Sequence, residues 1–172
     1  NTIFLDCVDN VNANTFYIDV DKFGFVNEED LSECLTYCNE AGYTTLVSIQ
    51  MANNEIGTIQ YIKRLSNITH SYGAIFHTDA VQAFGKMYID VNSDNIDLMS
   101  VSGHKIGCPK GIGFLYIKNG IEIEPLIYGS QMNGMRGGTE NVPYIIGMAK
   151  AVEMLDNLKL QRRTKSFVQE EI

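Results

Sequence analysis

The sequence predicts an α/β fold with a mostly parallel central sheet flanked by helices. Two apolar runs, Thr45–Gln50 and Ala74–Thr78, are separated by a segment with helical periodicity, and a connection of that length joins parallel strands by a right-handed crossover. Polar segments directly follow the apolar runs, as expected where ligands bind at the carboxyl edge of an open α/β sheet. With 172 residues and 45% hydrophobic residues, the chain can form one substantial core.

The N-terminal half begins with an alternating segment, Phe16–Val20, that predicts a strand. A helix follows, because Asn27 is a good N-cap and the acidic residues 28–30 suit the positive end of the helix dipole. Ala41-Gly42 ends this helix. One of its faces carries Leu31, Leu35 and Cys38.

Apolar residues at helical spacing predict a second helix over Thr58–Tyr72, through Ile59, Ile62, Leu65 and Ile68. Two further strands are expected at Ile96–Val101 and Gly113–Ile117. Asn141 is expected to cap a last helix whose inward residues are Ile145, Met148, Val152 and Leu155. The charged end of the chain, Glu170-Glu171-Ile172, has no helix cap, so we expect a piece of a longer protein.

The net charge of −8, with dispersed basic residues, argues against a nucleic-acid partner. No apolar run is long enough to cross a bilayer, and the N-terminus lacks the order of a signal peptide, so we expect no membrane association and a cytoplasmic location. The four cysteines are irregularly spaced, which favours reduced thiols. Cys34 and Cys38 share one helix face, where packing is a simpler explanation than metal binding. We expect no metal site.

Ser102-Gly103-His104-Lys105 directly follows the apolar run Ile96–Val101. A lysine at the end of a buried strand, beside a hydroxyl and an imidazole, suits attachment of pyridoxal 5'-phosphate (PLP) as a Schiff base. Asp79 ends another apolar run, and PLP needs a carboxylate against its pyridine nitrogen. The alternatives are a solvated loop lysine and an ordinary turn aspartate.

Five segments follow one another in the chain: Val47–Ile49 with Asn53–Gly57, His77–Gln82, Asp97–Lys105, Pro109–Gly113 and Met135–Asn141. In this order they resemble the cysteine desulfurases of the NifS/IscS type, which are fold-type I PLP enzymes of the class V aminotransferase family. The resemblance implies that residues 1–160 are the central part of a PLP-binding large domain, here incomplete, and that residues 161–172 begin a helix leading toward a C-terminal domain.

The resemblance assigns a role to each matching residue. Lys105 would be the Schiff-base lysine and proton shuttle, and Asp79 would pair with the pyridine nitrogen. Gln82 would hydrogen-bond the phenolic oxygen of the ring, with Asn54 near that oxygen and the substrate carboxylate. The remaining assignments concern the phosphate: Ser102 and His104 would bind it, and Thr139 would reach the phosphate of the neighbouring subunit's cofactor, which implies a homodimer.

Simpler roles compete with two of these assignments. Asn54 could cap the following helix. His104 could be a core histidine bonded to backbone. The glycines Gly111, Gly113, Gly137 and Gly138 are better explained by backbone turns than by phosphate contacts.

By resemblance the whole enzyme removes sulfur from L-cysteine, giving L-alanine and an enzyme persulfide for a sulfur-acceptor or scaffold protein in iron–sulfur cluster assembly or tRNA thiolation. The family's nucleophilic cysteine is not among the matching segments, so we expect this chain alone to be inactive. Cys108 is a possible substitute, although it lies beside Pro109 in a rigid loop. The alternatives are another enzyme of this fold, such as a selenocysteine lyase or an aminotransferase, and a non-catalytic dimerisation or scaffold module.

Overall fold

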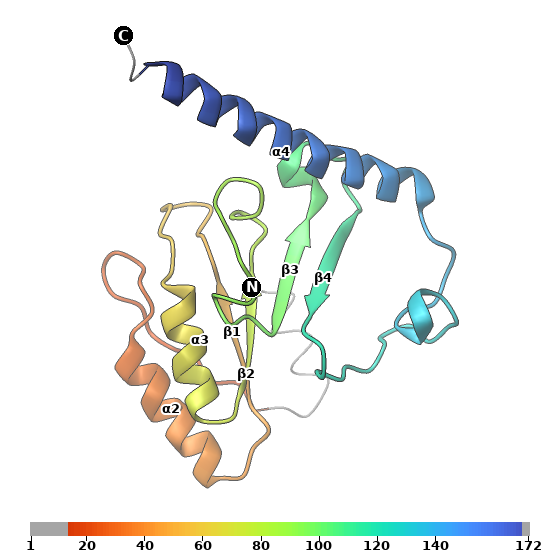
Figure 1. Cartoon of the computed structure of the whole chain (residues 1–172). Coiled ribbons are helices and arrows are strands. Elements are labelled where there is room, and N and C mark those ends of the chain that lie inside the picture. The colour runs from red at the N-terminus through yellow and green to blue at the C-terminus, as the bar shows by residue number, and fades with distance from the viewer. Residues whose placement is uncertain (1–13, 170–172) are drawn as a thin grey trace.

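A four-stranded sheet with the strand order β1-β2-β3-β4 organises the chain in the computed structural model, which describes residues 14–169, with side chains to residue 155 (Figure 1). The strands are β1 (Leu46–Gln50), β2 (Ile75–Asp79), β3 (Leu98–Ser102) and β4 (Gly113–Ile117). The helices are α2 (Glu28–Glu40), α3 (Ile62–Ser71) and α4 (Val142–Gln169), with short 3-10 helices η1 (Gly103–Ile106) and η2 (Met132–Gly134).

The predicted, mostly parallel sheet is confirmed. β1 and β2 are parallel and joined through α3, and β3 pairs parallel to β2. β4 is antiparallel to β3, because the short segment that holds η1 turns straight back. The carboxyl ends of β1, β2 and β3 therefore lie at one edge of the sheet.

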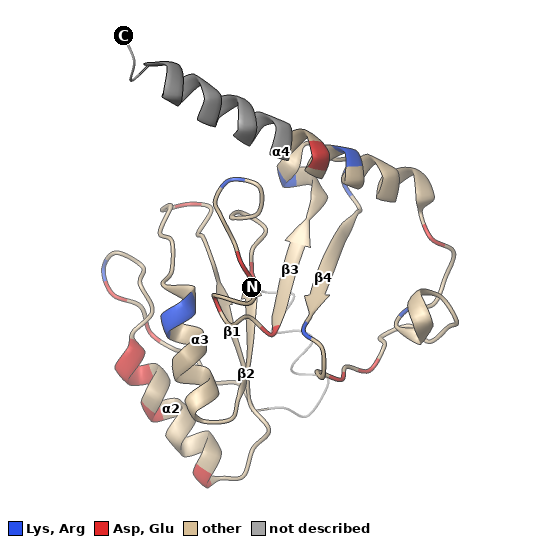
Figure 2. Ribbon diagram, viewed as in Figure 1, with Lys and Arg blue, Asp and Glu red and all other residues tan. Residues whose placement is uncertain are grey.

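Helices α2 and α3 lie along one face of the sheet, and α4 crosses its carboxyl edge beside η1 (Figure 1). Phe76 and Thr78 of β2 point toward the helical face and are 0% exposed. Arg64 Nε lies 2.7 Å from Glu28 Oε2 and joins α3 to α2, where acidic side chains gather (Figure 2). The alternate residues of the strands, including His77, point to the opposite face.

The helix starting after Asn27 is confirmed, since Asn27 Oδ1 accepts hydrogen bonds from the backbone N–H groups of Glu29 and Asp30. Its predicted inward residues Leu31, Leu35 and Cys38 are buried. This helix thus forms as its pattern indicates, with Glu29 exposed in its first turn and Glu28 half-buried against Arg64.

The expected inward face of α4 is correct only in part. Asn141 Oδ1 accepts a hydrogen bond from Tyr144 N, which supports the predicted cap. Met148 is buried, but Ile145 is 45% exposed, so its assignment to the inward face was wrong. Helix α4 meets the lysine loop at Tyr144 and Gly147, beside Cys108, and the Ile145 side chain lies outside that contact.

The predicted strand Phe16–Val20 is wrong. Val20 alone forms an isolated bridge, to Val26, because Asp21 Oδ1 accepts hydrogen bonds from Phe23 N and Phe25 N and folds the chain into a tight turn. Although apolar and polar residues alternate over 16–20, this segment does not pair with a neighbouring strand of the sheet.

The helix predicted over Thr58–Tyr72 begins four residues later, at Ile62. Gln60 N donates to Met51 O, and the Gln60 side chain binds the backbone of Gly24 and Val26, which holds this stretch extended. The third strand is also shifted, to Leu98–Ser102, because Ile96 N donates to Val91 O within the preceding turn.

Helix α4 runs unbroken across residue 160, where the sequence analysis divided the chain, and that division stays a prediction. Residues 1–13, which include Cys7, and residues 170–172 lie outside the described range. Within it, no helix combines the length and apolar character needed to span a membrane.

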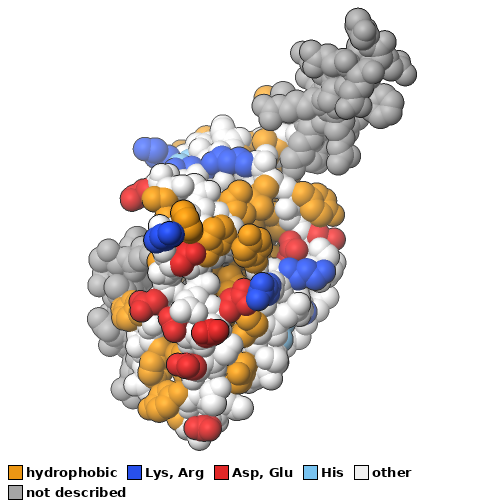
Figure 3. Space-filling model, turned by 90° about the vertical axis from the view of Figure 1, so that its left-hand side faces the viewer, with side chains coloured by type: hydrophobic (Ala, Val, Ile, Leu, Met, Phe, Trp, Pro, Cys, Tyr) orange, Lys and Arg blue, Asp and Glu red, His pale blue; other side chains and the backbone are white. Residues whose placement is uncertain are grey.

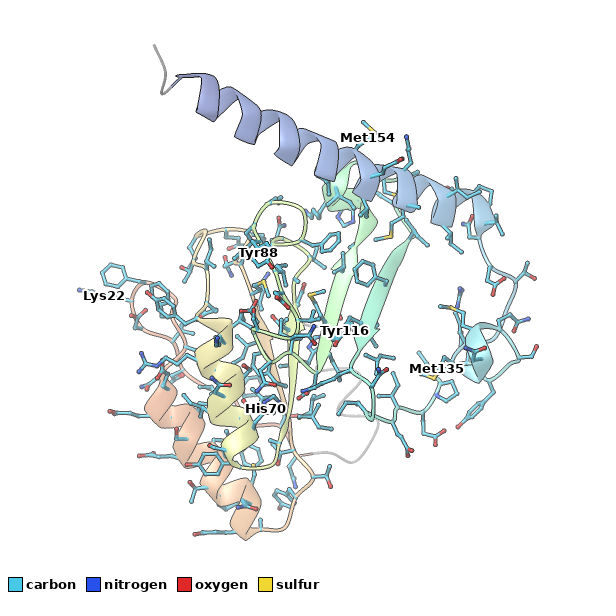
Figure 4. All side chains as sticks on the ribbon, in the orientation of Figure 1. Lys22, His70, Tyr88, Tyr116, Met135 and Met154 are labelled. Carbon is cyan, nitrogen blue, oxygen red and sulfur yellow. The ribbon has the colours of Figure 1, made fainter. Side chains whose placement is uncertain are left out.

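Asp97 lies buried at the end of the sheet opposite α4 and joins three elements. Its Oδ2 lies 2.5 Å from His70 Nε2 of α3, whose position Figure 4 labels, and accepts a hydrogen bond from Phe76 N at 2.9 Å. Its Oδ1 lies 3.0 Å from Lys118 Nζ. Burial alone would raise the pKa of Asp97, but the hydrogen bonds from Phe76, His70 and Lys118 outweigh it and hold the pKa below its usual value.

Asp97→Asn should lower the free energy of unfolding by about 1–3 kcal/mol at pH 7, the usual cost of breaking hydrogen bonds to a buried charged group. Because the pKa of Asp97 is depressed in the folded state, its contribution is complete above about pH 4 and is lost as the pH falls further. Urea unfolding between pH 3 and pH 7 should therefore show a flatter pH dependence in the variant. Glu153→Gln, at an exposed pair with Lys150, is the control and should change neither quantity; equal pH dependence in parent and Asp97→Asn contradicts the assignment.

Candidate functional site

Three polar loops meet at the carboxyl edge of the sheet. The strand register aligns Gln50 with Asp79 and Asp79 with Ser100, so β1 and β2 end at the same level, beside Ser100 of β3, and β3 continues to Ser102. The last residues of these strands and the loops that follow them carry six of the seven predicted site residues, which are Asn54, Asp79, Gln82, Ser102, His104 and Lys105. The fold thus brings together the elements that the sequence analysis singled out.

Asp79 is half-buried at the last position of β2. Its Oδ1 accepts a hydrogen bond from Val81 N at 2.8 Å, which shapes the turn after the strand. None of the described residues donates to Oδ2. Asp79 is therefore a turn aspartate that still has one carboxylate oxygen available to a ligand.

The loop that carries Lys105 is tightly closed at its base. Gly103 N donates to Ile112 O at 2.9 Å, and Cys108 N donates to Gly103 O at 3.1 Å. A Cβ atom at Gly113 would lie 2.4 Å from Val101 O, so only glycine allows β3 and β4 to approach this closely. Lys105 is exposed on η1, and none of the described residues accepts a hydrogen bond from its amino group.

His104 and Ser102 form a polar pair beside Lys105. Ser102 Oγ lies 2.7 Å from His104 Nδ1, and the imidazole is exposed. The alternative of a core histidine bonded to backbone is therefore wrong. Because the two groups are bonded to each other, a neutral ring leaves one donor for an anionic group: the hydroxyl if Nδ1 carries the proton, or Nε2–H if it does not. A protonated ring leaves both as donors.

Asn54 does not cap a helix, because α3 begins only at Ile62. The preceding residue, Asn53, holds the turn, since its Oδ1 accepts from Glu55 N and Ile56 N. Asn54 Oδ1 instead lies 3.5 Å from Gln50 Nε2 at the end of β1. Its amide NH₂ group is left for a ligand.

Gln82 lies in the turn after β2, three residues beyond Asp79. Its Oε1 accepts a hydrogen bond from Lys86 Nζ at 2.8 Å. This contact orients the amide so that its NH₂ group remains available as a donor.

Thr139 is the one predicted residue that the fold keeps apart from the others. It is exposed in the segment between η2 and α4, which extends away from the sheet (Figure 1). None of the described hydrogen bonds links it to the loops at the carboxyl edge. Its predicted role toward a neighbouring subunit stays a prediction.

The sequence analysis gave no role to His77, which the structure places two residues before Asp79 on the same face of β2. Its Nδ1 lies 2.8 Å from Ser48 Oγ and its Nε2 lies 2.9 Å from Ser100 Oγ. A polar residue at every second position of neighbouring strands was the sequence signal that could have indicated this row.

Cys108, the possible substitute nucleophile, is 7% exposed beneath α4. Its Sγ lies 3.9 Å from Tyr144 O, and a Cβ at Gly147 would lie 3.9 Å from the same sulfur. The thiol is thus packed between its loop and the helix, without room to swing outward.

A separate groove of about 540 Å³ lies at the start of α3, lined by residues that include Tyr61, Lys63, Met87 and Tyr88. Figure 3 views the side of the molecule that carries α2 and α3 and shows apolar side chains among charged ones. In residues 14–155 no group of three or more His, Cys, Asp or Glu side chains is arranged to hold a metal ion.

Comparison with known proteins gives one family. The model described as Aminotransferase class-V matches residues 5–169. A cysteine desulfurase IscS from Dictyoglomus turgidum is 50% identical over 139 residues, which are 80% of this chain and 34% of that protein. A cysteine desulfurase IscS from Clostridium botulinum is 49% identical over the same length. The chain thus spans about one third of the length of these relatives.

Solved structures agree with this result. A NifS-like protein from Rickettsia africae superposes with a TM-score of 0.80 at 35% identity, over 96% of this chain and 48% of that one. A structure described as SspA in complex with cysteine gives a TM-score of 0.79 at 37% identity, over 88% of this chain and 43% of that one. The expected resemblance to NifS-like PLP enzymes of fold-type I is confirmed.

Gly113→Ala should lower the free energy of unfolding by about 1–3 kcal/mol, because the new methyl group would press against the backbone of β3. Gly147→Ala is the matched control: its Cβ would meet only ordinary contacts at 3.8 Å and 3.9 Å, and the variant should gain about 0.4–1 kcal/mol from helix propensity. Urea unfolding measures both. Equal effects of the two substitutions would show that the close approach of β3 and β4 does not constrain the lysine loop.

Proposed function

The chain belongs to the aminotransferase class-V family, and we propose that it forms the central part of the PLP-binding large domain of a cysteine desulfurase. Its relatives named cysteine desulfurase support this activity. The observation that carries the proposal is the meeting of the Lys105 loop and Asp79 at one edge of the sheet.

The side chains at this edge fit PLP chemically. Lys105 offers an amino group without a competing partner among the described residues, and Asp79 Oδ2 offers an acceptor for a protonated pyridine nitrogen. Ser102 and His104 would donate to the phosphate, and the NH₂ group of Gln82 would donate to the phenolic oxygen. Asn54 would lie near that oxygen and the substrate carboxylate.

PLP, when bound, supplies an electron sink for the carbanion that forms when the α-proton of the substrate leaves. Lys105 would hold the cofactor through Nζ and then accept the α-proton of L-cysteine at the same atom. Asp79 would keep a proton on the pyridine nitrogen through a charge-assisted hydrogen bond. The tight base of the loop limits the motion of Lys105 during proton transfer.

Sulfur removal also needs a thiolate that reaches the sulfur of L-cysteine, leaving L-alanine and an enzyme persulfide. Cys38 and Cys108 are buried, and burial raises the pKa of Cys34, with the neighbouring Cys38 adding to the effect. None of these three thiols suits the role. By resemblance the nucleophilic cysteine belongs to a part of the whole protein that these 172 residues do not include, so we expect this chain by itself to lack the activity.

We further propose a homodimer in which Thr139 reaches the cofactor phosphate of the partner. The segment leading to Thr139 exposes large apolar side chains, among them Leu126, which is 97% exposed, and such surface favours burial against another protein. A sulfur-acceptor or scaffold protein would take the persulfide sulfur for iron–sulfur cluster assembly or thiolation. The free thiols Cys34, Cys38 and Cys108 support a cytoplasmic location.

Borohydride reduction of the whole protein loaded with PLP should fix the cofactor covalently on Lys105, because Lys105 lies on η1, directly after β3. Peptide mapping by mass spectrometry identifies the labelled lysine. Lys110, in the same loop, and Lys118, after β4, are internal controls. Label on either of them, with none on Lys105, contradicts the proposed attachment.

Asp79→Ala in the whole protein should lower turnover of L-cysteine by orders of magnitude while leaving some PLP bound, because the ring loses the partner of its nitrogen but keeps its other contacts. Alanine release measures turnover and cofactor absorbance measures binding. Turnover equal to that of the parent would remove the ring-pairing role from Asp79. Asp90→Ala, in a turn outside the proposed site, is the control and should keep the parent's turnover.

A further inference from the structure

A row of three hydrogen-bonded side chains crosses the face of the sheet that carries Asp79. Ser48 of β1 lies 2.8 Å from His77 Nδ1, and Ser100 of β3 lies 2.9 Å from His77 Nε2. The imidazole therefore bridges all three parallel strands. No other described side chain is hydrogen-bonded to side chains of two neighbouring strands in this way.

The bridge uses both ring nitrogens, which fixes the orientation of the ring. A neutral imidazole has one donor and one acceptor, so one serine hydroxyl accepts from the ring and the other donates to it. Burial lowers the pKa of His77, and the charge of Asp79 offsets this only in part. The ring is thus held uncharged beside Asp79, and it does not compete as a cation for the carboxylate.

The bridge lies next to Asp79, the residue proposed to contact the pyridine nitrogen, on the side of Asp79 away from the carboxyl edge of the sheet. His77 and Asp79 are two positions apart on β2, and Ser100 is the register partner of Asp79. Ala80 N also donates to Ser100 O at 3.0 Å, so the backbone on the other side of Asp79 is tied to the same residue. Ser100 therefore contacts the chain on both sides of Asp79: its hydroxyl is bonded to the His77 ring, and its carbonyl oxygen accepts from Ala80 N.

Resting on the proposed function, we propose that His77 is a positioning residue of the PLP site: bridged to Ser48 and Ser100, it holds the ends of the three strands so that the Asp79 carboxylate meets the pyridine nitrogen. It acts through Asp79 and touches neither substrate nor cofactor. The consequence is energetic coupling between His77 and Asp79 in PLP binding.

A double-mutant cycle on the whole protein tests this coupling. Single variants His77→Phe and Asp79→Ala and the double variant are compared with the parent for the PLP dissociation constant, by absorbance titration, and for the free energy of unfolding of the cofactor-free protein. His77→Phe keeps a planar ring but removes both hydrogen bonds. It should weaken PLP binding roughly tenfold in the parent, as is typical when a residue that orients a ligand contact is removed, and less than about twofold in the Asp79→Ala background.

Two amide variants, His77→Asn and His77→Gln, test the positioning role even if His77→Phe folds poorly. His77→Asn retains a polar group near the position of Nδ1, and His77→Gln retains one near that of Nε2. Because Ser100 is tied to Asp79, His77→Gln should restore the parent's cofactor absorption spectrum and affinity better than His77→Asn. Ser100→Ala should resemble His77→Phe, whereas Ser48→Ala should have the smaller effect.

The outcomes separate the two proposals. Equal weakening by His77→Phe in both backgrounds, or no rescue by His77→Gln, overturns the positioning role and leaves the PLP site intact. If Asp79→Ala itself leaves PLP affinity and the cofactor spectrum unchanged, the ring-pairing assignment fails and the positioning role fails with it. Weakening confined to the background with Asp79 supports both.

Discussion

The ends of three parallel strands are held side by side because Gln50 pairs with Asp79 and Asp79 with Ser100. That register places Asp79 beside the strand that leads to Ser102 and the Lys105 loop. A shift by one residue on β2 would send Asp79 to the helical face and bring Thr78 in its place. The buried residues of that face, Phe76 above all, oppose such a shift, since it would expose them.

Polar contacts reinforce the register at both ends of the strands. At the end away from α4, Asp97 connects His70 of α3, Phe76 of β2 and Lys118 beyond β4. Near the carboxyl edge, His77 connects β1 and β3 on the opposite face. The first contact set stabilises the packing of the helix on the sheet, and the second lies below the proposed reaction centre. Asp97 thus stabilises the fold and His77 supports the proposed site, and the two groups lie at opposite ends of the strands.

The sequence predicted those parts of the fold that depend on local pattern. The cap at Asn27, the crossover between β1 and β2 and the loops with Asp79 and Lys105 are all present. Predictions failed where distant contacts overrode the pattern: Gln60 is bound to Gly24 and Met51, which delays the start of α3. The role of Ser48, His77 and Ser100 was missed because it exists only once three strands are aligned.

A crystal structure of the whole protein with PLP tests the central claim, that the carboxyl edge of this sheet is the cofactor site. Electron density should run without a break from Lys105 Nζ to the cofactor, with an oxygen of Asp79 about 2.6–3.2 Å from the pyridine nitrogen. PLP bound at another place, or at this edge with its pyridine nitrogen turned away from Asp79, contradicts the claim.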